Sequence, residues 1–417
     1  MKTKNKIIIV LVLLLLVRLF LIIHFKTYAH PKLWEYEEIA NNLIAGKGFL
    51  YHHFGGVPYR SFNNPLYSFM SAGIYLITNH SYLAILLVQT LFSILLVYVI
   101  FCIGRLVFND KIGLFSSILV AFHPSLIYYD VFNLIPFSID LFFIALITLL
   151  FLRYKENTNN LKMLLAGAFI GLGVLSRGII GAILPFFILY IVIFFNNYIW
   201  RKKIKLILFL TIGAIFVISP WVIRNYIIHK KFILVSAVGE TLWRGNNKYS
   251  TGTSFSKDGK PIFFLWPEEF RKKVYSLDEI GQSKFFAKEA GRFIKNNPSD
   301  FINLYFKKMF YFWWFSPQSG ILYPKDYLFI YKVMYTILLA FSLLGIYLIF
   351  ISKEKLKKEN SLLIITVFAA ICFSQSLFYV EGRHRWLIEP LLIIFFTYGI
   401  SECYTILVKK INPKIIK

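Results

Sequence analysis

Ten apolar stretches constrain this chain of 417 residues more than any other feature of its sequence. A helix needs about 17–25 mostly apolar residues to cross the hydrocarbon core of a bilayer. Hydrophobic residues make up 58% of the chain and charged residues only 16%, against about 25% charged residues in typical soluble proteins. We therefore predict an all-α polytopic membrane protein. The predicted spans lie near residues 7–25, 82–104, 112–129, 135–152, 163–176, 179–197, 206–222, 328–352, 361–380 and 386–408.

Basic residues gather in every second connection between these stretches. One such cluster lies within the first residues of the chain. The others follow the second, fourth, sixth, eighth and tenth stretches. Because cytoplasmic loops carry the excess of Lys and Arg, both termini are predicted to be cytoplasmic. Residues 26–81 and 223–327 then form two large outer loops. The chain divides into an N-terminal membrane core, a large outer loop and C-terminal spans, at residues 1–222, 223–327 and 328–417.

The net charge of +25 comes from 46 basic and 21 acidic residues. This charge is scattered between apolar stretches, which suits anionic lipid headgroups and not a nucleic-acid partner. Cys102, Cys372 and Cys403 all lie in apolar stretches without metal-ligand spacing and are predicted to be packing residues. The sequence has no Asp-x-Asp pair, no glycine-rich phosphate loop and no Gly-x-Ser-x-Gly element. No metal and no cofactor are therefore expected.

The first outer loop begins with an amphipathic pattern at residues 34–49. Tyr36, Ile39, Ala40 and Leu43 form one apolar stripe at helical spacing, and Gly46 suits a helix end. Such a helix is predicted to lie flat at the membrane interface. Residues 64–78 form a second short apolar segment, which is predicted to be interfacial or re-entrant because a span there would turn every later basic loop outward.

Polar residues collect at the predicted outer ends of the spans. They are Glu35, Glu37, Glu38, Tyr128, Tyr129, Asp130, Arg177, Arg224, Asn225, Glu381, Arg383, His384 and Arg385. A ring of acids and arginines at one depth suits a polar reaction at the membrane surface, although any single arginine there can also anchor to lipid headgroups. Asp140, within the fourth stretch, is a candidate for either a functional or a packing role.

Several motifs in order along the chain resemble one family of membrane enzymes. Residues 36–49 read Y-x-x-I-A-x-N-L-x-x-G-x-G-F and are similar to the first outer loop of C-type-fold glycosyltransferases of family 39. This dolichyl-phosphate-mannose-protein mannosyltransferase-like group includes relatives of the protein O-mannosyltransferases and of lipid A aminoarabinose transferase. Further similar segments lie at residues 64–67, 171–177, 220–225, 242–247, 251–252, 382–385 and 389–390.

The resemblance implies a membrane glycosyltransferase with its active site on the extracytoplasmic face of the cell membrane. It would move a sugar, with inversion, from a polyprenyl-phosphate donor to a glycolipid, glycan or protein acceptor. Many relatives carry an acid where this chain has Lys32. Glu35 is therefore the predicted general base and Glu38 the second candidate. Glu37, predicted on the most exposed side of the helix, ranks third. Asp130 is a further candidate for the catalytic acidic residue because of its location.

The remaining predicted site residues divide between the donor and the acceptor. The resemblance implies that the donor phosphate is bound by Arg177, Arg383, His384 and Arg385, with Arg224 at the edge. The acceptor would be bound by Trp243, Asn246 and Asn247 of the large outer loop. Two alternatives stay open: an oligosaccharyltransferase or glycan polymerase that uses a diphosphate donor, and a non-enzymatic transporter of lipid-linked sugars.

Overall fold

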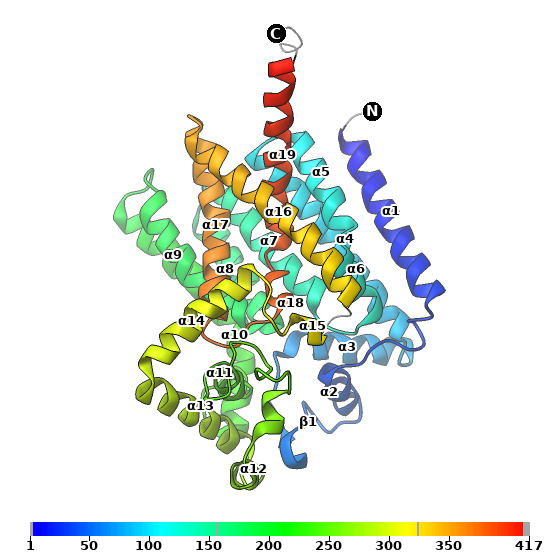
Figure 1. The fold of residues 1–417 in the computed structure, drawn as a ribbon, viewed down its shortest axis with the longest axis vertical. Helices are drawn as coiled ribbons and strands as arrows, with labels where there is room; N and C mark the ends of the chain where they lie inside the picture. The colour runs from blue at the N-terminus through cyan, green and yellow to red at the C-terminus, as the bar shows by residue number, and fades with distance from the viewer. Residues whose placement is uncertain (1–2, 156, 323–324, 412–417) are drawn as a thin grey trace.

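A computed structural model describes residues 3–155, 157–322 and 325–411 of the chain. Its helices lie side by side in one bundle, and both ends of the chain lie at the same end of that bundle (Figure 1). The helices that make up the bundle are α1 (Thr3–His24), α4 (Tyr82–Val107), α5 (Asp110–Ala121), α6 (Pro124–Phe132), α7 (Phe137–Tyr154), α8 (Asn160–Ser176), α9 (Ile183–Phe194), α10 (Trp200–His229), α16 (Lys325–Ile351), α17 (Lys355–Gln375) and α19 (Glu389–Ile411).

Each of the ten predicted apolar stretches is helical in the structure. Among the described residues, six helices are long and apolar enough to cross a membrane, and α5 with α6, bent by 47° at their break, would make a seventh. The helix α8 and the segment Gly178–Phe194, which joins the 3-10 helix η2 (Gly178–Ala182) to α9, are apolar but shorter. The chain is thus a multi-pass membrane protein, and the number of ten spans stays a prediction.

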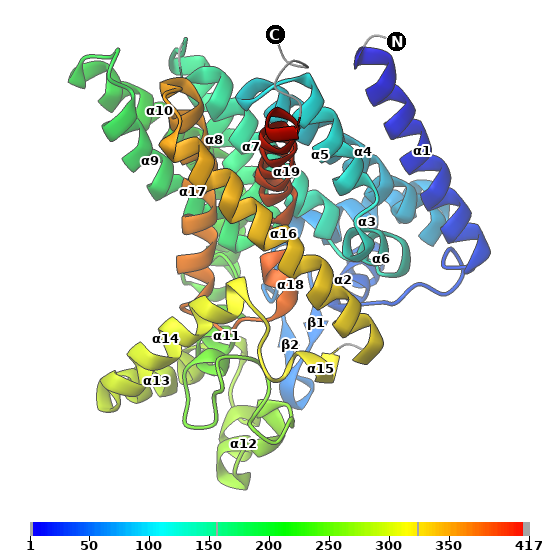
Figure 2. The same cartoon turned by 45° about the horizontal axis from the view of Figure 1, so that its top comes forward.

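The other elements cover the end of the bundle opposite the chain termini (Figures 1 and 2). The first group follows α1: α2 (Glu35–Ile44), the hairpin of β1 (Tyr51–His52) and β2 (Pro58–Tyr59) with η1 (Phe54–Gly56) between them, and α3 (Pro65–Thr78). The second follows α10: α11 (Val238–Gly245), η3 (Ile262–Leu265), α12 (Glu268–Tyr275), α13 (Glu279–Asn296), α14 (Pro298–Trp313) and α15 (Ser319–Leu322). The short α18 (Gly382–Arg385) joins α17 to α19 at the same end.

The amphipathic helix predicted after the first span is present as α2. Ile39 and Ala40 on its apolar stripe are fully buried, and the chain leaves the helix through Gly46 at φ 71°, a left-handed conformation that glycine adopts readily. The helix α10 runs to His229 without interruption although it contains Pro220. Its last turns therefore project beyond residue 222, where the predicted outer loop begins.

Glycines allow pairs of long helices to touch through their backbones. A Cβ atom at Gly167 of α8 would lie 1.9 Å from the carbonyl oxygen of Leu210, and one at Gly213 of α10 would lie 2.1 Å from that of Leu164. Gly345 of α16 and Gly399 of α19 meet in the same reciprocal way: a Cβ atom at Gly345 would lie 2.3 Å from a backbone oxygen of α19, and one at Gly399 would lie 2.2 Å from a backbone oxygen of α16. Close packing through small residues is the usual way in which helices associate within a lipid bilayer.

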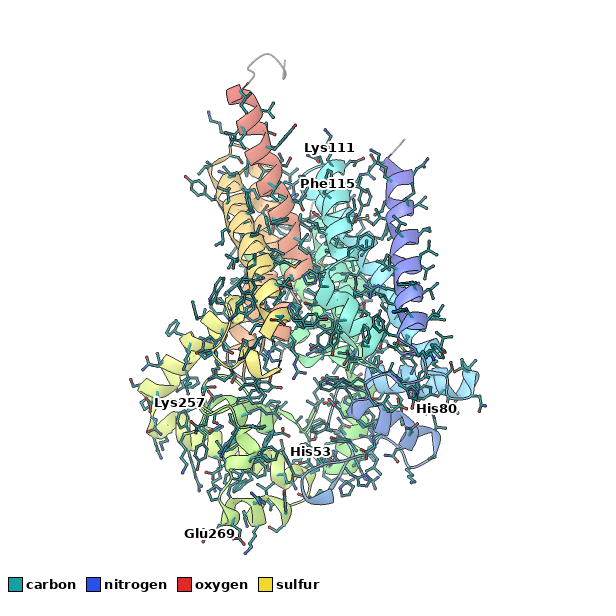
Figure 3. All side chains as sticks on the ribbon, turned by 45° about the vertical axis from the view of Figure 1, so that its right-hand side comes forward. His53, His80, Lys111, Phe115, Lys257 and Glu269 are labelled. Atoms are coloured by element: carbon teal, nitrogen blue, oxygen red, sulfur yellow. The ribbon has the colours of Figure 1, made fainter. Side chains whose placement is uncertain are left out.

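The predicted orientation can be tested with single cysteines at exposed positions. Lys257 and Glu269 lie at the end of the molecule opposite Lys111 (Figure 3). We expect a membrane-impermeant maleimide added to intact cells to label Lys257→Cys and Glu269→Cys and to spare Lys111→Cys and Asn157→Cys. Permeabilised cells, in which all four should react, provide the control. Labelling of Lys111→Cys in intact cells would contradict the orientation.

Candidate active site

A cavity of about 370 Å³ lies where α2, α8, α11 and α18 meet. Its aromatic lining residues include Trp34, Tyr36, Tyr51, Phe62, Tyr129, Phe137 and Tyr379. Its polar and charged lining residues are Glu35, His53, Asn63, Asn64, Ser176, Arg177, Glu240, Thr241, Arg244, Arg383 and His384. The cavity thus joins segments that are distant in sequence, and it lies at the end of the bundle that carries α2 and α11 (Figure 1).

Glu35 enters the cavity from the first turn of α2. Its Oε1 accepts a hydrogen bond from Nδ2 of Asn63 at 2.8 Å, and the side chain remains partly exposed. The pKa of the neighbouring Tyr36 hydroxyl depends on the charges nearby. Burial raises the pKa of the Tyr36 hydroxyl, Glu35 raises it further, and the positive charge of Arg177 opposes the rise. Glu35 and Arg177 therefore act on the same small region of the cavity.

Arg177 follows the last residue of α8 and is oriented by a buried acid. Its Nε donates to Oδ2 of Asp140 at 2.5 Å, and Oδ1 of Asp140 accepts a hydrogen bond from the hydroxyl of Ser176 at 2.5 Å. Asp140 is fully buried, whereas 30% of the Arg177 side chain is exposed. Asp140, for which the sequence left two roles open, thus positions an arginine that lines the cavity.

Arg383 and His384 enter from α18. Nε of Arg383 pairs with Oε2 of Glu381 at 3.0 Å. Nδ1 of His384 accepts a hydrogen bond from the backbone N–H of Glu381 at 3.1 Å. Burial lowers the pKa of His384 well below its ordinary value, and nearby arginines, foremost Arg383, lower it further. The ring is therefore neutral, and because Nδ1 accepts, Nε2 carries the proton and is the ring's remaining donor.

A further pair of charged residues in the cavity, Glu240 and Arg244, was not predicted from the sequence. Glu240 of α11 pairs with Arg244 one turn later, and its Oε2 lies 3.0 Å from Nε2 of His53. Burial alone would raise the pKa of Glu240, but Arg244 and His53 outweigh it and hold that pKa below its ordinary value. The signal in the sequence was the i, i+4 spacing of Glu240 and Arg244, of which Arg244 lies within the similar segment at residues 242–247.

Two of the predicted phosphate-binding arginines do not line the cavity. Arg385 is fully buried, with Nε 2.9 Å from Oε1 of Glu389 and its guanidinium carbon 3.7 Å from the ring centre of Tyr335. Arg224 donates to the backbone oxygen of Arg60 and stacks over Trp221 at 4.7 Å. Both arginines hold parts of the protein together.

The other predicted acids have partners outside the cavity. Glu38 bonds to Nδ1 of His52 at 2.7 Å. Asp130 is buried on α6 and pairs with Arg18 of α1 at 2.9 Å. The prediction that Glu37 faces the most exposed side of its helix is wrong. It is 7% exposed and accepts a hydrogen bond from the hydroxyl of Tyr75 at 2.5 Å, because α3 packs over that face of α2.

The predicted acceptor residues are buried in the segment that follows α10. Trp243 belongs to an aromatic cluster with Trp266 and Phe286. Nδ2 of Asn246 donates to the backbone oxygens of Leu242 and Leu377, both at 2.8 Å, and Nδ2 of Asn247 donates to that of Trp243 at 2.8 Å. These three residues fix the position of α11, and the residues of α11 that reach the cavity are their neighbours.

Within residues 3–155, 157–322 and 325–411, no group of three or more His, Cys, Asp or Glu side chains is placed to hold a metal ion. Of the two acids that line the cavity, Glu35 accepts a hydrogen bond from the amide of Asn63, and Glu240 is paired with Arg244 and His53.

Comparison with known proteins gives similarity in sequence and in fold. Residues 62–223 match the family model described as dolichyl-phosphate-mannose-protein mannosyltransferase. A search of curated proteins found no match. The structure is similar to the oligosaccharyltransferase of Archaeoglobus fulgidus in its apo form, with a TM-score of 0.59 and 14% identity over 97% of this chain and 52% of that chain.

Two other solved structures are similar. The archaeal oligosaccharyltransferase AglB from Archaeoglobus fulgidus, in complex with an inhibitory peptide and a dolichol-phosphate, has a TM-score of 0.57 and 12% identity over 99% of this chain and 52% of that chain. ArnT from Cupriavidus metallidurans, bound to undecaprenyl phosphate, has a TM-score of 0.46 and 14% identity over 97% of this chain and 80% of that chain.

The chain spans about half the length of the archaeal oligosaccharyltransferases that it matches. Its fold is nevertheless similar to theirs over nearly the whole of this chain. The resemblance found in the sequence is thus confirmed: residues 62–223 match the dolichyl-phosphate-mannose-protein mannosyltransferase family, and the chain has the C-type glycosyltransferase fold.

Proposed function

We propose that the protein is a glycosyltransferase that moves one sugar from a polyprenyl-phosphate donor to a hydroxyl acceptor on the extracytoplasmic face of the cell membrane. The observation that supports this most is the cavity that Glu35, Arg177 and Arg383 line together. One carboxylate and two oriented guanidinium groups are the side chains that transfer of a phosphate-linked sugar needs.

The arrangement suits an inverting displacement. The acceptor oxygen attacks the anomeric carbon, the bond from that carbon to the phosphate oxygen breaks, and polyprenyl phosphate leaves with the bonding electron pair. Glu35 takes the proton of the acceptor hydroxyl as general base. Arg177 and Arg383 stabilise the phosphate charge, because guanidinium groups match phosphate geometry, and Nε2–H of His384 adds a neutral donor.

Two observations on other proteins agree with such a donor and acceptor. The solved structure of AglB holds a dolichol-phosphate and an inhibitory peptide, and another structure of the archaeal oligosaccharyltransferase is tethered to an acceptor peptide. For this chain we propose the polyprenyl-phosphate sugar as donor. A glycolipid, glycan or protein can each supply the acceptor hydroxyl.

The proposal is tested with purified protein in lipid nanodiscs, given short-chain polyprenyl-phosphate sugars and extracted envelope material. Mass spectrometry should detect a glycosylated acceptor and released polyprenyl phosphate in equal amounts. Transfer from polyprenyl-diphosphate donors alone would favour the oligosaccharyltransferase alternative. Movement of a lipid-linked sugar across a vesicle membrane without any transfer would favour the transporter.

Replacing Arg177 or Arg383 by Lys should weaken donor binding by about 10- to 100-fold, because Lys keeps the charge but loses the planar pair of donors. The measurement is the affinity of each purified variant for a short-chain polyprenyl phosphate. Arg224→Lys is the matched control, since Arg224 lies on the same side of the molecule but outside the cavity, and it should bind as wild type does. Wild-type affinity in both cavity variants would place the phosphate elsewhere.

A further inference from the structure

One face of α11 forms a wall of the cavity that the proposed chemistry does not use. Four residues at the spacing of one helical stripe line the cavity: Ala237, Glu240, Thr241 and Arg244. The other face of α11 packs tightly against α13, since a Cβ atom at Gly239 would lie 1.9 Å from the backbone oxygen of Ser283. The helix therefore cannot turn, and its polar stripe stays directed at the cavity.

The charged groups of this stripe are held in fixed positions. Glu240 is 4% exposed, and it is bonded by Arg244 and by His53. The guanidinium of Arg244 lies between two rings, 4.4 Å from the centre of Phe263 and 4.7 Å from that of Tyr379. A helix that only needed to be stable could place such a pair in solvent, as Glu268 and Lys272 do on α12 with both side chains about 75% exposed.

The chemistry of the wall fits the hydroxyl groups of a sugar ring. A carboxylate accepts hydrogen bonds from hydroxyls and a guanidinium donates to them, and the aromatic residues Tyr51 and Tyr379 line the same cavity. Glu240 and Arg244 compensate each other in charge, so the wall suits a neutral ligand. A second phosphate group at this wall would meet the carboxylate of Glu240.

The position of the wall indicates that it contacts the sugar that is transferred from the donor. In the displacement above, the phosphate, the anomeric carbon and the acceptor oxygen lie on one line, between the arginines Arg177 and Arg383 and the base Glu35. The rest of the sugar ring extends sideways from that line. In a cavity of about 370 Å³, the other polar lining residues besides those of α11 and His53 are already bonded within the protein: Asn63 to Glu35, Asn64 to the backbone of Val174 and Gly178, and Ser176 to Asp140.

Resting on the proposed function, we propose that Glu240, Thr241 and Arg244 bind the ring hydroxyls of the transferred sugar and select a neutral donor sugar by those hydroxyls. A site built to bind a hydroxyl strongly disfavours the analogue that lacks it, because its buried polar groups are then left unpaired. The identity of the sugar would thus be determined by one stripe of α11.

The test compares donors that differ by single hydroxyls. Wild-type protein receives polyprenyl-phosphate hexoses and their monodeoxy analogues, and kcat/KM is measured for each. We expect at least one deoxy donor to be disfavoured by about 10- to 100-fold, as for a lost hydrogen bond to a charged group. In Glu240→Gln this preference should shrink to a few-fold, because the hydroxylated donor loses rate and the deoxy donor does not.

Two further variants make the outcome decisive. Thr241→Val keeps the Glu240–Arg244 pair intact and tests the same stripe if Glu240→Gln folds poorly; it too should reduce the preference. Glu268→Gln removes an acid with the same i, i+4 basic partner on the exposed α12 and should leave the preference unchanged. Two outcomes would contradict this inference and leave the proposed function intact. One is an equal loss of kcat/KM for all donors in both α11 variants, and the other is a wild-type protein that accepts every deoxy donor equally. Absence of transfer from every donor overturns the proposed function as well.

Discussion

Replacing Glu35 by Gln is expected to lower turnover by about 10²–10⁴-fold, the usual contribution of a general base. The amide keeps the shape of the side chain and can still bond to Asn63, but it cannot take a proton. Donor binding should stay close to wild type because Arg177 and Arg383 are unchanged. The measurement is single-turnover transfer together with polyprenyl-phosphate affinity for the same purified sample.

Glu38→Gln is the matched comparison for this experiment. Glu38 lies one turn further along the same helix, but it bonds to His52 and does not line the cavity. Its replacement should change turnover by no more than a few-fold. If Glu38→Gln abolished transfer and Glu35→Gln did not, the base would be Glu38 and the assignment made from the cavity would be wrong.

Asp130→Asn is expected to destabilise the folded protein by about 3–5 kcal/mol, the usual cost of breaking a buried ion pair by removing one partner. The substitution leaves the guanidinium of Arg18, which is 1% exposed, without its counter-charge between α1 and α6. The measurement is thermal unfolding of the purified protein in detergent. Activity should fall only as far as the folded fraction falls.

A double variant separates this structural role from a catalytic one. Replacing both members of a buried pair by apolar residues is often neutral for stability, so Arg18→Met with Asp130→Leu should regain most of the lost stability. Because Asp130 does not line the cavity, the double variant should also regain transfer activity. A stable double variant without transfer activity would place Asp130 in the reaction after all.

The elements that depend on local pattern were predictable from the sequence. The stripe of Ile39 and Ala40 predicted α2, and apolar length predicted the helices of the bundle, since both follow from helical periodicity and from the thickness of a bilayer. Arg177 was predicted at the end of one span and Arg383 at the start of the last span, so both were expected at the same end of the molecule. Their common place in one cavity is seen in the structure.

The features that depend on tertiary packing were not predictable. A helical wheel places Glu37 on a polar face, but it does not show that α3 covers this face and that Tyr75 supplies a hydrogen bond there. Motif similarity drew attention to Trp243 of α11 and to Asn246 directly after it, which are buried structural residues. The spacing of Glu240 and Arg244 is common on solvent-exposed helices, so only the packing of α11 identifies it as part of a cavity.

The reciprocal glycine contacts described above bear on how a long lipid substrate can arrive. Backbone contact between α8 and α10, and between α16 and α19, leaves no side chain that could swing aside to open a passage within either pair. Each pair therefore moves as one body. For the proposed function, this means that a polyprenyl chain entering sideways from the bilayer would have to pass beside such a pair and not through it.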